Sequence, residues 1–191
     1  MKQPSNSSIA KGAAFAIAAI LLLFVSAGVA TAQRRDYMIE QEIELVRENQ
    51  DIDRRISVLV RMIDRRFAAM KIEVGGWKPR DRDLDEWGEL PESRSVDLWW
   101  DIRQLLTKAM DDIDSIAERD AHALPQNRTG GRLFPKAVKM LEEAARRYLE
   151  PLKSSSEGQI DERERGLILN SVELCEQVIA AAANLQTPQR K

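Results

Sequence analysis

One stretch of the chain carries acidic residues at the spacing of a calcium-binding loop. Asp81, Asp83 and Asp85 alternate with other residues, and Glu92 follows eleven positions after Asp81. An EF-hand loop takes acidic ligands from its positions 1, 3, 5 and 12, so these four residues match its carboxylate pattern. Its sixth position requires glycine for a sharp turn, and here that position holds Glu86. We therefore expect a solvated acidic loop, and calcium binding by the four carboxylates is the alternative.

All four tryptophans lie between positions 77 and 100. Indole rings are flat and amphipathic, so such a cluster suits a surface for a sugar, a peptide or a lipid headgroup. Trp99 falls on the apolar stripe of a predicted helix and is expected in the core, whereas Trp100 points about 100° away from it. We expect the indoles mainly to pack against the fold. A ligand surface made of Trp77, Trp87 and Trp100 is the alternative interpretation.

Few other side chains could do chemistry. Cys175 is the only cysteine, and its neighbours at helical spacing are apolar, so we expect a buried and inert thiol. His122 is the only histidine, and neither a second Glu-x-x-His motif nor a haem or zinc signature accompanies it. This pattern favours a non-catalytic protein over an enzyme. It also predicts no cofactor other than the calcium of the alternative above.

A basic stripe runs along the first apolar-periodic segment. Arg54, Arg61 and Arg65 recur at helical spacing and could face an anionic lipid or polymer. Acidic residues are interspersed with them, so we expect an internal ladder of salt bridges instead. An antiparallel hairpin would bring Arg54 and Arg55 close to the acidic cluster at 111–114, which is the predicted partner.

The first of four segments with helical periodicity is also the longest. It is predicted to run unbroken from Tyr37 to about Glu73, because neither glycine nor proline interrupts it before Gly75. At 1.5 Å per residue such a helix would be about 55 Å long. It contains an echo, since Ile52-Asp53-Arg54-Arg55 and Ile63-Asp64-Arg65-Arg66 lie eleven residues apart, close to three turns. Both copies should therefore show the same face.

A loop rich in Gly, Pro and Trp separates the first segment from the second. The second begins at Ser93 or Ser95, either of which is suited to cap a helix. The third has Pro135 in its first turn and ends at Pro151 and the serines that follow. The fourth spans about 161–185. The sequence thus predicts an all-α fold, an antiparallel four-helix bundle with a long first helix and a Trp-rich loop between helices 1 and 2.

The N-terminal segment at 1–32 has the pattern of a signal peptide. A polar start with two lysines precedes an unbroken apolar run at 13–24. The segment closes on Ala30-Thr31-Ala32, whose small residues two apart are typical of a signal-peptidase site. We therefore expect export across the cytoplasmic membrane. An uncleaved membrane anchor is the alternative, because residues 13–30 just reach the length of a membrane span.

Residues 33–186 are expected to form a single helical-bundle domain, followed by a frayed tail at 187–191. Removing the two leader lysines from the 29 basic residues leaves 27 against 31 acidic ones. A mildly acidic chain is a poor candidate for binding nucleic acid. We expect an exported, non-catalytic protein of the cell envelope, periplasmic or secreted, that contacts another envelope protein. A ligand- or calcium-binding module built on the 77–100 region is the alternative.

Overall fold

The computed structural model describes residues 35–78, 80, 83–119 and 130–186. The chain divides into two compact units, Met1–Arg35 and Asp36–Lys191, and every helix named below belongs to the second. The expected leader or anchor at 1–32 and the expected tail at 187–191 lie outside the described residues. The described ranges hold no strand, and their helices are α2 (Glu40–Glu48), α3 (Ile52–Ala69), α4 (Leu84–Trp87), α5 (Ser95–Arg119), α6 (Gly130–Ser156) and α7 (Glu162–Gln186).

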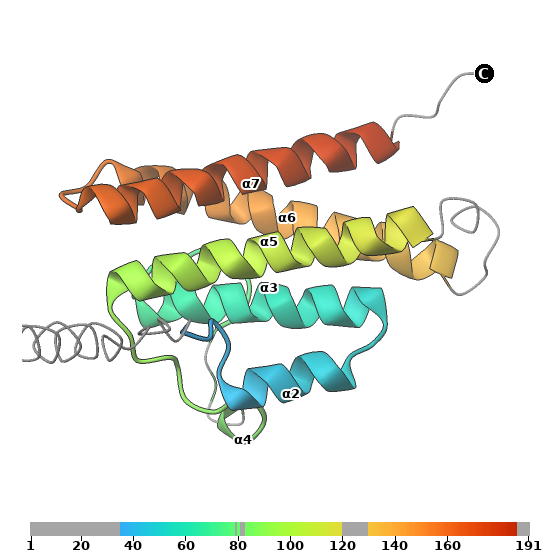
Figure 1. The fold of residues 1–191 in the computed structure, drawn as a ribbon, viewed down its shortest axis with the longest axis horizontal. Helices are drawn as coiled ribbons and strands as arrows, with labels where there is room; N and C mark the ends of the chain where they lie inside the picture. Colours follow the sequence, from blue (N-terminus) through green and yellow to red (C-terminus); the bar gives the residue numbers. More distant parts are fainter. Residues whose placement is uncertain (1–34, 79, 81–82, 120–129, 187–191) are drawn as a thin grey trace, which may run out of the picture. The chain divides into compact units, whose positions relative to one another are not determined.

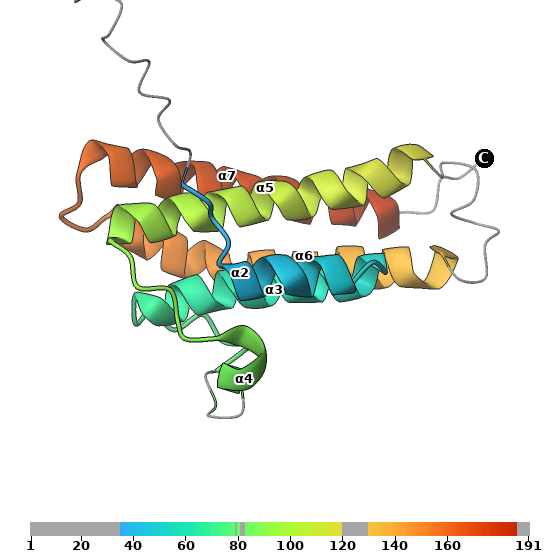
Figure 2. The same cartoon turned by 60° about the horizontal axis from the view of Figure 1, so that its bottom comes forward.

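The four long helices pack side by side in a bundle (Figures 1 and 2). Helix α3 packs on α5 and α6, and α7 packs on the same two helices from the other side. Asp53 pairs with Lys136 and Asp64 with Arg147, so α3 and α6 run parallel. Successive long helices alternate in direction along the chain (Figure 1). The prediction of an all-α protein with packed helices is confirmed, but these two neighbours are parallel where an antiparallel arrangement was expected.

The prediction of one unbroken first helix is wrong. Helix α2 ends at Glu48, and α3 begins at Ile52 after a three-residue turn. Asn49 donates its side-chain amide to the carbonyl of Leu45 at 2.8 Å and leaves the helical conformation, which closes α2. Asp51 then precedes α3 in an extended conformation. Asn and Asp compete with the helical backbone for hydrogen bonds, so they end helices without any glycine or proline.

The third helix begins earlier than predicted, but it ends at the serines after Pro151, as predicted. Helix α6 begins at Gly130, five residues before Pro135, and continues through Pro151 to Ser156. Each proline deletes one hydrogen bond of the helix. Tyr148 and Leu152, both fully buried beside Pro151, pack into the core and hold the helix together there. Helix α5 begins at Ser95, one of the two predicted starts, and the Ser95 hydroxyl donates to Glu164 of α7.

Helix α7 begins where the sequence predicts. Asp161 precedes it and accepts a hydrogen bond from the amide of Glu164 at 2.8 Å, as an N-cap residue does.

By length and composition alone, Glu162–Asn184 could cross a membrane, although 33% of the most apolar window is buried in the bundle. A core helix of a soluble bundle passes the same test. Leu169 on this helix is half exposed.

The core is centred on Phe67 of α3. Its ring packs edge-on against Trp99 of α5 at a centroid distance of 5.9 Å, and it lies tilted against the ring of Tyr148 of α6 at 5.2 Å. Three helices therefore meet through aromatic contacts, which add to the stability that burial of the rings provides.

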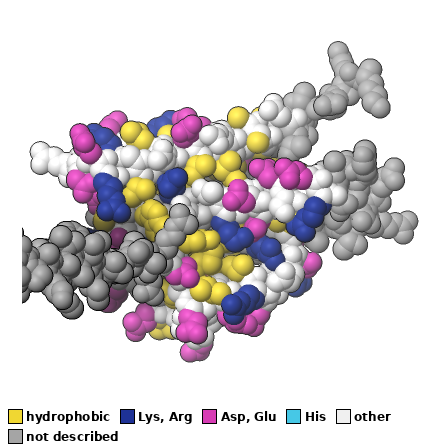
Figure 3. Space-filling view, viewed as in Figure 1, with side chains coloured by type: hydrophobic (Ala, Val, Ile, Leu, Met, Phe, Trp, Pro, Cys, Tyr) yellow, Lys and Arg dark blue, Asp and Glu magenta, His cyan; other side chains and the backbone are white. Residues whose placement is uncertain are grey.

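On the outside, hydrophobic side chains gather over the middle of the face formed by α2, α3 and α5, with charged side chains around them (Figure 3).

Candidate functional site

Helix α3 is enclosed on all sides over Met62–Phe67, where six consecutive side chains are buried. Three of them are charged: Asp64, Arg65 and Arg66 are each no more than 3% exposed. Removing an ion from water costs several kcal/mol unless the ion is paired and hydrogen-bonded. The partners of these three side chains therefore decide what this turn of the helix does.

Arg65 and Arg66 share the buried carboxylate of Glu42 from α2. Arg66 donates to both Glu42 oxygens, through Nη2 at 2.7 Å and also through Nη1, and Arg65 Nε lies 3.4 Å from the same carboxylate. Arg66 also donates to the Tyr37 carbonyl at 2.6 Å, and its Nε lies 3.4 Å from Asp101 of α5. We call Glu42, Arg65, Arg66 and Asp101 the arginine cluster. It joins α2 and α5 to α3.

The arginine cluster also fastens the Trp-rich loop, residues 74–94. Arg65 Nη2 donates to the Trp87 carbonyl at 2.9 Å and to the Glu89 carbonyl at 2.6 Å. Burial lowers the pKa of Arg65, and the nearby Glu42 carboxylate opposes that shift. The charged groups of the arginine cluster bind one another and backbone carbonyls. The cluster therefore stabilises the fold and does not offer these groups to a ligand.

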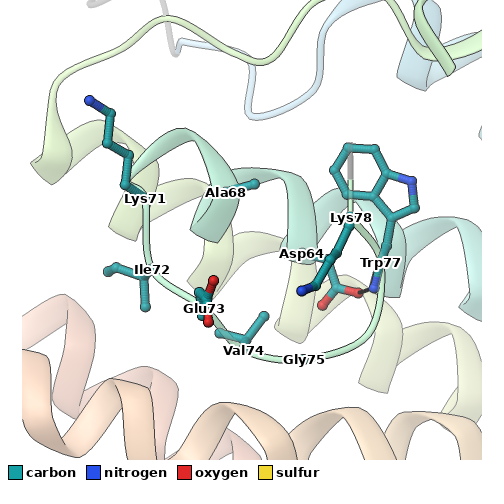
Figure 4. Close-up of a pocket in the computed structure, with 9 residues that line it drawn as sticks. All are labelled: Asp64, Ala68, Lys71, Ile72, Glu73, Val74, Gly75, Trp77 and Lys78. Atoms are coloured by element: carbon teal, nitrogen blue, oxygen red, sulfur yellow. Dashed lines mark hydrogen bonds between the residues drawn. The ribbon is translucent and has the colours of Figure 1, made fainter. Parts of the chain in front are cut away.

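A pocket of about 540 Å³ opens beside the C-terminal end of α3 (Figure 4). The loop that follows the helix curves around it, and the exposed side chains of Lys71 and Lys78 belong to its rim. The buried carboxyl of Asp64 lies on the helix side and points toward this loop (Figure 4). The other lining residues are Ala68, Ile72, Glu73, Val74, Gly75 and Trp77.

Asp64 organises this pocket through three donors. It accepts hydrogen bonds from the Tyr148 hydroxyl at 2.6 Å and from the Trp77 amide at 3.1 Å, and Arg147 Nη1 lies 3.5 Å away. Burial raises the pKa of Asp64, although all three donors act to lower it. Burial also raises the pKa of Tyr148 well above its ordinary value. Both hydrogen-bonded groups thus favour their neutral forms more than they would in water.

Glycines let the loop close over Arg147. Gly75 and Gly76 have φ values of +65° and +93°, which side chains other than glycine rarely adopt. The guanidinium donates to the carbonyls of Val74 and Gly75. A Cβ atom on Gly76 would overlap that guanidinium. The pocket wall therefore depends on this glycine pair.

Lys71 also adopts a left-handed conformation, with φ of +60°, and is the only described residue other than glycine with a positive φ. It occupies the first position beyond the cap of α3. The Ile72 amide donates back to the Phe67 carbonyl at 2.9 Å and the Lys71 amide to Ala68 at 3.0 Å, which is the Schellman motif. Glycine is the usual residue at this place, so a lysine here stores backbone strain at the rim of the pocket.

Two tryptophans of the loop pack against arginines of α3. Trp87 is 2% exposed, with the Arg61 guanidinium 4.3 Å from its ring centroid. Trp77 is partly buried, lies 5.2 Å from the same guanidinium, and donates its indole N–H to Asp83 at 3.1 Å. Arg61 pairs with Asp83 at 2.8 Å. Burial raises the pKa of Asp83, but the hydrogen bonds from Trp77 and Arg61 outweigh it and leave the pKa below its ordinary value.

The other two tryptophans lie on α5. Trp99 is 4% exposed in the core, so the expectation for it is confirmed. Trp100 is partly buried and packs edge-on against Tyr37 at 6.1 Å between centroids. The candidate ligand surface is therefore divided: Trp77 and Trp87 share Arg61, and Trp100 faces the segment before α2.

The carboxylates of the alternative calcium site form no group of possible metal ligands within the described residues. Asp83 is engaged by an arginine and an indole, Asp85 lies exposed on α4, and Glu92 lies exposed in the loop. Asp81 falls outside the described ranges, as does His122. In the part of the chain that is described, no three His, Cys, Asp or Glu side chains could hold a metal ion together. Cys175 is fully buried as predicted, and burial raises its pKa to about 12.

Two of the three arginines of the expected salt-bridge ladder form internal ion pairs, but the predicted partner in the second helix is wrong. Arg61 and Arg65 pair with Asp83 and Glu42, while Arg54 approaches only the exposed Asp51, at 3.8 Å. The acidic cluster at 111–114 is not among these partners, because the loop and α2 fold over α3 and supply the carboxylates instead. Sequence analysis overlooked the role of Glu42. Its position between Met38 and Leu45 on the apolar stripe is the signal that could have revealed a buried charge.

Comparisons of the chain with protein-family models, with curated proteins and with solved structures found no match. The chemistry of the described residues is therefore the basis for assigning a function. Besides the pocket at Asp64, two hollows carry that argument: an apolar groove among α5, α6 and α7, and a smaller polar cavity near the start of α3.

Proposed function

We propose that this chain is an exported, non-catalytic helical-bundle protein of a cell envelope that binds a partner protein through an apolar groove. The pattern of residues 1–32 supports export, and attachment to the membrane through residues 13–30 is the alternative. The groove among α5, α6 and α7 carries the proposed binding role.

The groove has a volume of about 470 Å³ and a mainly apolar lining. Small side chains, Ala117, Ala181 and Ala182, leave room between larger ones. The apolar positions recur three or four residues apart on each helix, which is how bundles receive the apolar face of an amphipathic helix. The other apolar lining residues are Met110, Ile113, Phe134, Val138, Leu141 and Val178.

The charge at the groove indicates the chemistry of the partner. Asp114 lines it, and Asp111 and Glu118 are exposed on the same helix. Arg119 follows them but bonds back to the carbonyl and hydroxyl of Ser115, both at 2.9 Å. Complementary charge steers association and sets orientation. The partner segment is therefore an amphipathic helix with Leu or Ile on one face and Lys or Arg beside them.

Model peptides test this proposal with purified full-length protein. A Leu/Lys amphipathic peptide and a Leu/Glu peptide with the same apolar face are titrated into ¹⁵N-labelled protein. We expect the Leu/Lys peptide to shift amide resonances of the groove and to bind about tenfold more tightly, a difference of about 1.4 kcal/mol. Equal affinities, or shifts confined to other helices, would contradict the proposal.

A matched pair of substitutions on α7 sharpens the test. Ala181 is exposed and lines the groove, so Ala181→Trp should fill it without disturbing the core. Ala180 is exposed but is not a groove residue, so Ala180→Trp is the control. We expect only Ala181→Trp to abolish peptide binding. In cells, a photo-crosslinking residue at 181 should trap one discrete envelope protein, and the same residue at 180 should not.

Cell fractionation with N-terminal sequencing tests the location. A mature form that begins at Gln33 is expected for a cleaved leader. An intact N-terminus in the membrane fraction would identify the anchored alternative, and a cytoplasmic protein would refute export.

Ligand binding by the Trp-rich loop is the second candidate function. One observation favours it: the indole N–H of Trp87 has no hydrogen-bond partner beside a polar cavity.

A further inference from the structure

Helix α7 has an outward face that no other described helix covers. It packs only on α5 and α6 among the described helices and lies on the outside of the bundle (Figure 1). Its composition would allow it to span a membrane, yet only 33% of its most apolar window is buried. Leu169 lies on this face and is 50% exposed. The groove proposed for the partner protein takes its α7 residues from Val178 onward, so this face is a separate surface.

Charged side chains surround Leu169 on the outward face. Positions four and seven residues away lie on the same side of an α-helix. All four of these positions are exposed and charged: Glu162, Arg165, Glu173 and Glu176. A single exposed leucine is ordinary on a protein surface. The order of the charges around it is therefore what indicates a partner.

The two inner charges are not used within the described part of the chain. Arg165 and Glu173 form no ion pair there. Arg165 donates to the Gly158 carbonyl at 3.4 Å, and Glu173 accepts from Gln177 at 3.4 Å. Both hydrogen bonds are long, and both side chains are exposed. The guanidinium and the carboxylate are therefore available to opposite charges on another molecule.

The inner charges are placed symmetrically about Leu169. Arg165 lies four residues before it and Glu173 four residues after it, which is about 6 Å along the helix in each direction. If a second copy of α7 lies antiparallel with Leu169 on the two-fold axis, each Arg165 faces Glu173 of the other copy. A two-fold interface must be self-complementary in this way, because every contact occurs twice. A parallel alignment would set like charges against each other.

The outer charges are compatible with the antiparallel alignment. Glu162 would face Glu176 of the other copy, but Lys153 of α6 pairs with Glu176 at 2.9 Å. Each outer contact therefore holds a cation beside two acids. Lys153 and Glu176 are half exposed, so water screens this contact and it contributes little. The inner pairs decide the alignment.

We propose that this chain forms a two-fold homodimer in which the outward faces of α7 pack antiparallel about Leu169. The two leucines cover each other, and two Arg165–Glu173 ion pairs flank them. A contact made by one helix of each protomer is small. The dimer is therefore reversible, with a dissociation constant of micromolar order.

Sedimentation equilibrium of the full-length protein measures the association. Leu169→Glu should weaken dimerisation at least about tenfold, because it brings two carboxylates together at the two-fold axis. Leu84→Glu is the matched control, since Leu84 is 53% exposed on α4 and lies outside this face. That variant should dimerise normally. A protein that stays monomeric up to millimolar concentration, or an equal loss in both variants, would overturn the proposal.

A charge exchange tests the alignment of the two helices. Arg165→Glu places a carboxylate opposite each Glu173 of the other copy and should weaken the dimer about tenfold. Adding Glu173→Arg to the same chain restores opposite charges at both contacts, so the double variant should dimerise as the unmodified protein does. Absence of this rescue would contradict the antiparallel pairing. Far-UV circular dichroism checks that each variant folds.

Disulfide linkage gives a second test of the alignment. Leu169→Cys should form a linked dimer under a mild oxidant, because the two residues meet on the axis. Glu173→Cys is the control: its two copies lie eight residues apart, about 12 Å along the axis, whereas a disulfide needs Cα atoms within about 7 Å. The natural Cys175 is fully buried and does not compete. Linkage at both positions, or at neither, would overturn the proposal.

A lipid surface is the other occupant that an apolar helix face could bind. Flotation of the full-length protein with phosphatidylcholine vesicles distinguishes it from a second copy. For the proposed dimer, Leu169→Glu should leave flotation unchanged and reduce only the association of the protein with itself. A monomeric protein whose flotation is lost in Leu169→Glu but kept in Leu84→Glu would assign the face to lipid and overturn the dimer.

Discussion

Substitution of Glu42 tests how the bundle holds its first helix. The side chain is 0% exposed, and its carboxylate faces Arg65, Arg66 and the amide of Ile39 at 3.2 Å. Glu42→Ala removes the acid that both arginines share and leaves Asp101 as the remaining acid of the arginine cluster. The cluster then carries one uncompensated positive charge in buried surroundings.

The structure sets the expected size of the effect. Removing one partner of a buried ion pair costs about 3–5 kcal/mol, because the other charge stays buried without compensation. An exposed pair such as Glu44–Arg47, whose side chains are 60% and 72% exposed, contributes only about 0–1 kcal/mol. A domain of this size has a free energy of unfolding of about 5–15 kcal/mol. Glu42→Ala should therefore remove a large part of the stability, and Glu44→Ala almost none.

Urea unfolding of the full-length protein measures both values. Tryptophan fluorescence and far-UV circular dichroism follow the transition, and amide hydrogen exchange reports on α2 separately. We expect Glu42→Ala to remove exchange protection over Glu40–Glu48 as well as to lower the unfolding midpoint. If that variant does not fold, Glu42→Gln keeps the shape and one acceptor oxygen and should give an intermediate loss.

The outcome that refutes this reasoning is a loss below about 1 kcal/mol for Glu42→Ala, which is the range of an exposed pair. Such a result would mean that water reaches Arg65 and Arg66 when the acid is removed. Unchanged exchange in α2 would likewise show that apolar contacts, such as that of the buried Leu45, hold this helix without the arginine cluster.

Three substitutions and one labelling experiment test other parts of the structure. Gly76→Ala should lower the free energy of unfolding by more than about 1 kcal/mol, because its Cβ would overlap Arg147 and its φ is positive. Gly166→Ala, at a helical position with open space around it, should raise the free energy of unfolding by about 1 kcal/mol. Thermal unfolding measures both changes. Lys71→Gly should raise the free energy of unfolding by about 1 kcal/mol, and a loss would show that the left-handed lysine is not strained. Burial raises the pKa of Cys175 to about 12, so a thiol reagent should label it only after denaturation; rapid native labelling would contradict its burial.

Helical periodicity predicted the class of the fold because it records which face of each helix meets the core. Trp99 and Cys175 lie on apolar stripes, and both are buried. The end of α2 was less predictable, since only glycine or proline was expected to interrupt the first segment. Asn49 ends α2 by a side-chain hydrogen bond, and α6 passes through Pro151 to the predicted end at the serines because packing on both sides outweighs one lost hydrogen bond.

The hollows could not be predicted from the sequence, because each joins side chains that are distant along the chain. Asp53, Trp87 and Lys136 come from three helices around the polar cavity. The tryptophan cluster was noticed as a chemical feature. Its division between Arg61 and Tyr37 depends on how the loop folds back, which periodicity does not encode.

The turn between α2 and α3 accounts for both the arginine cluster and the polar cavity. In an unbroken helix, Glu42 would lie about 36 Å from Arg66, since each residue adds 1.5 Å. The turn lets α2 fold back along α3, so Glu42 reaches the second copy of the Asp-Arg-Arg echo and buries it (Figure 1). The first copy shows the same face but is not covered in this way. There Arg54 remains exposed, and Asp53 is left beside the cavity with an oxygen that has no partner.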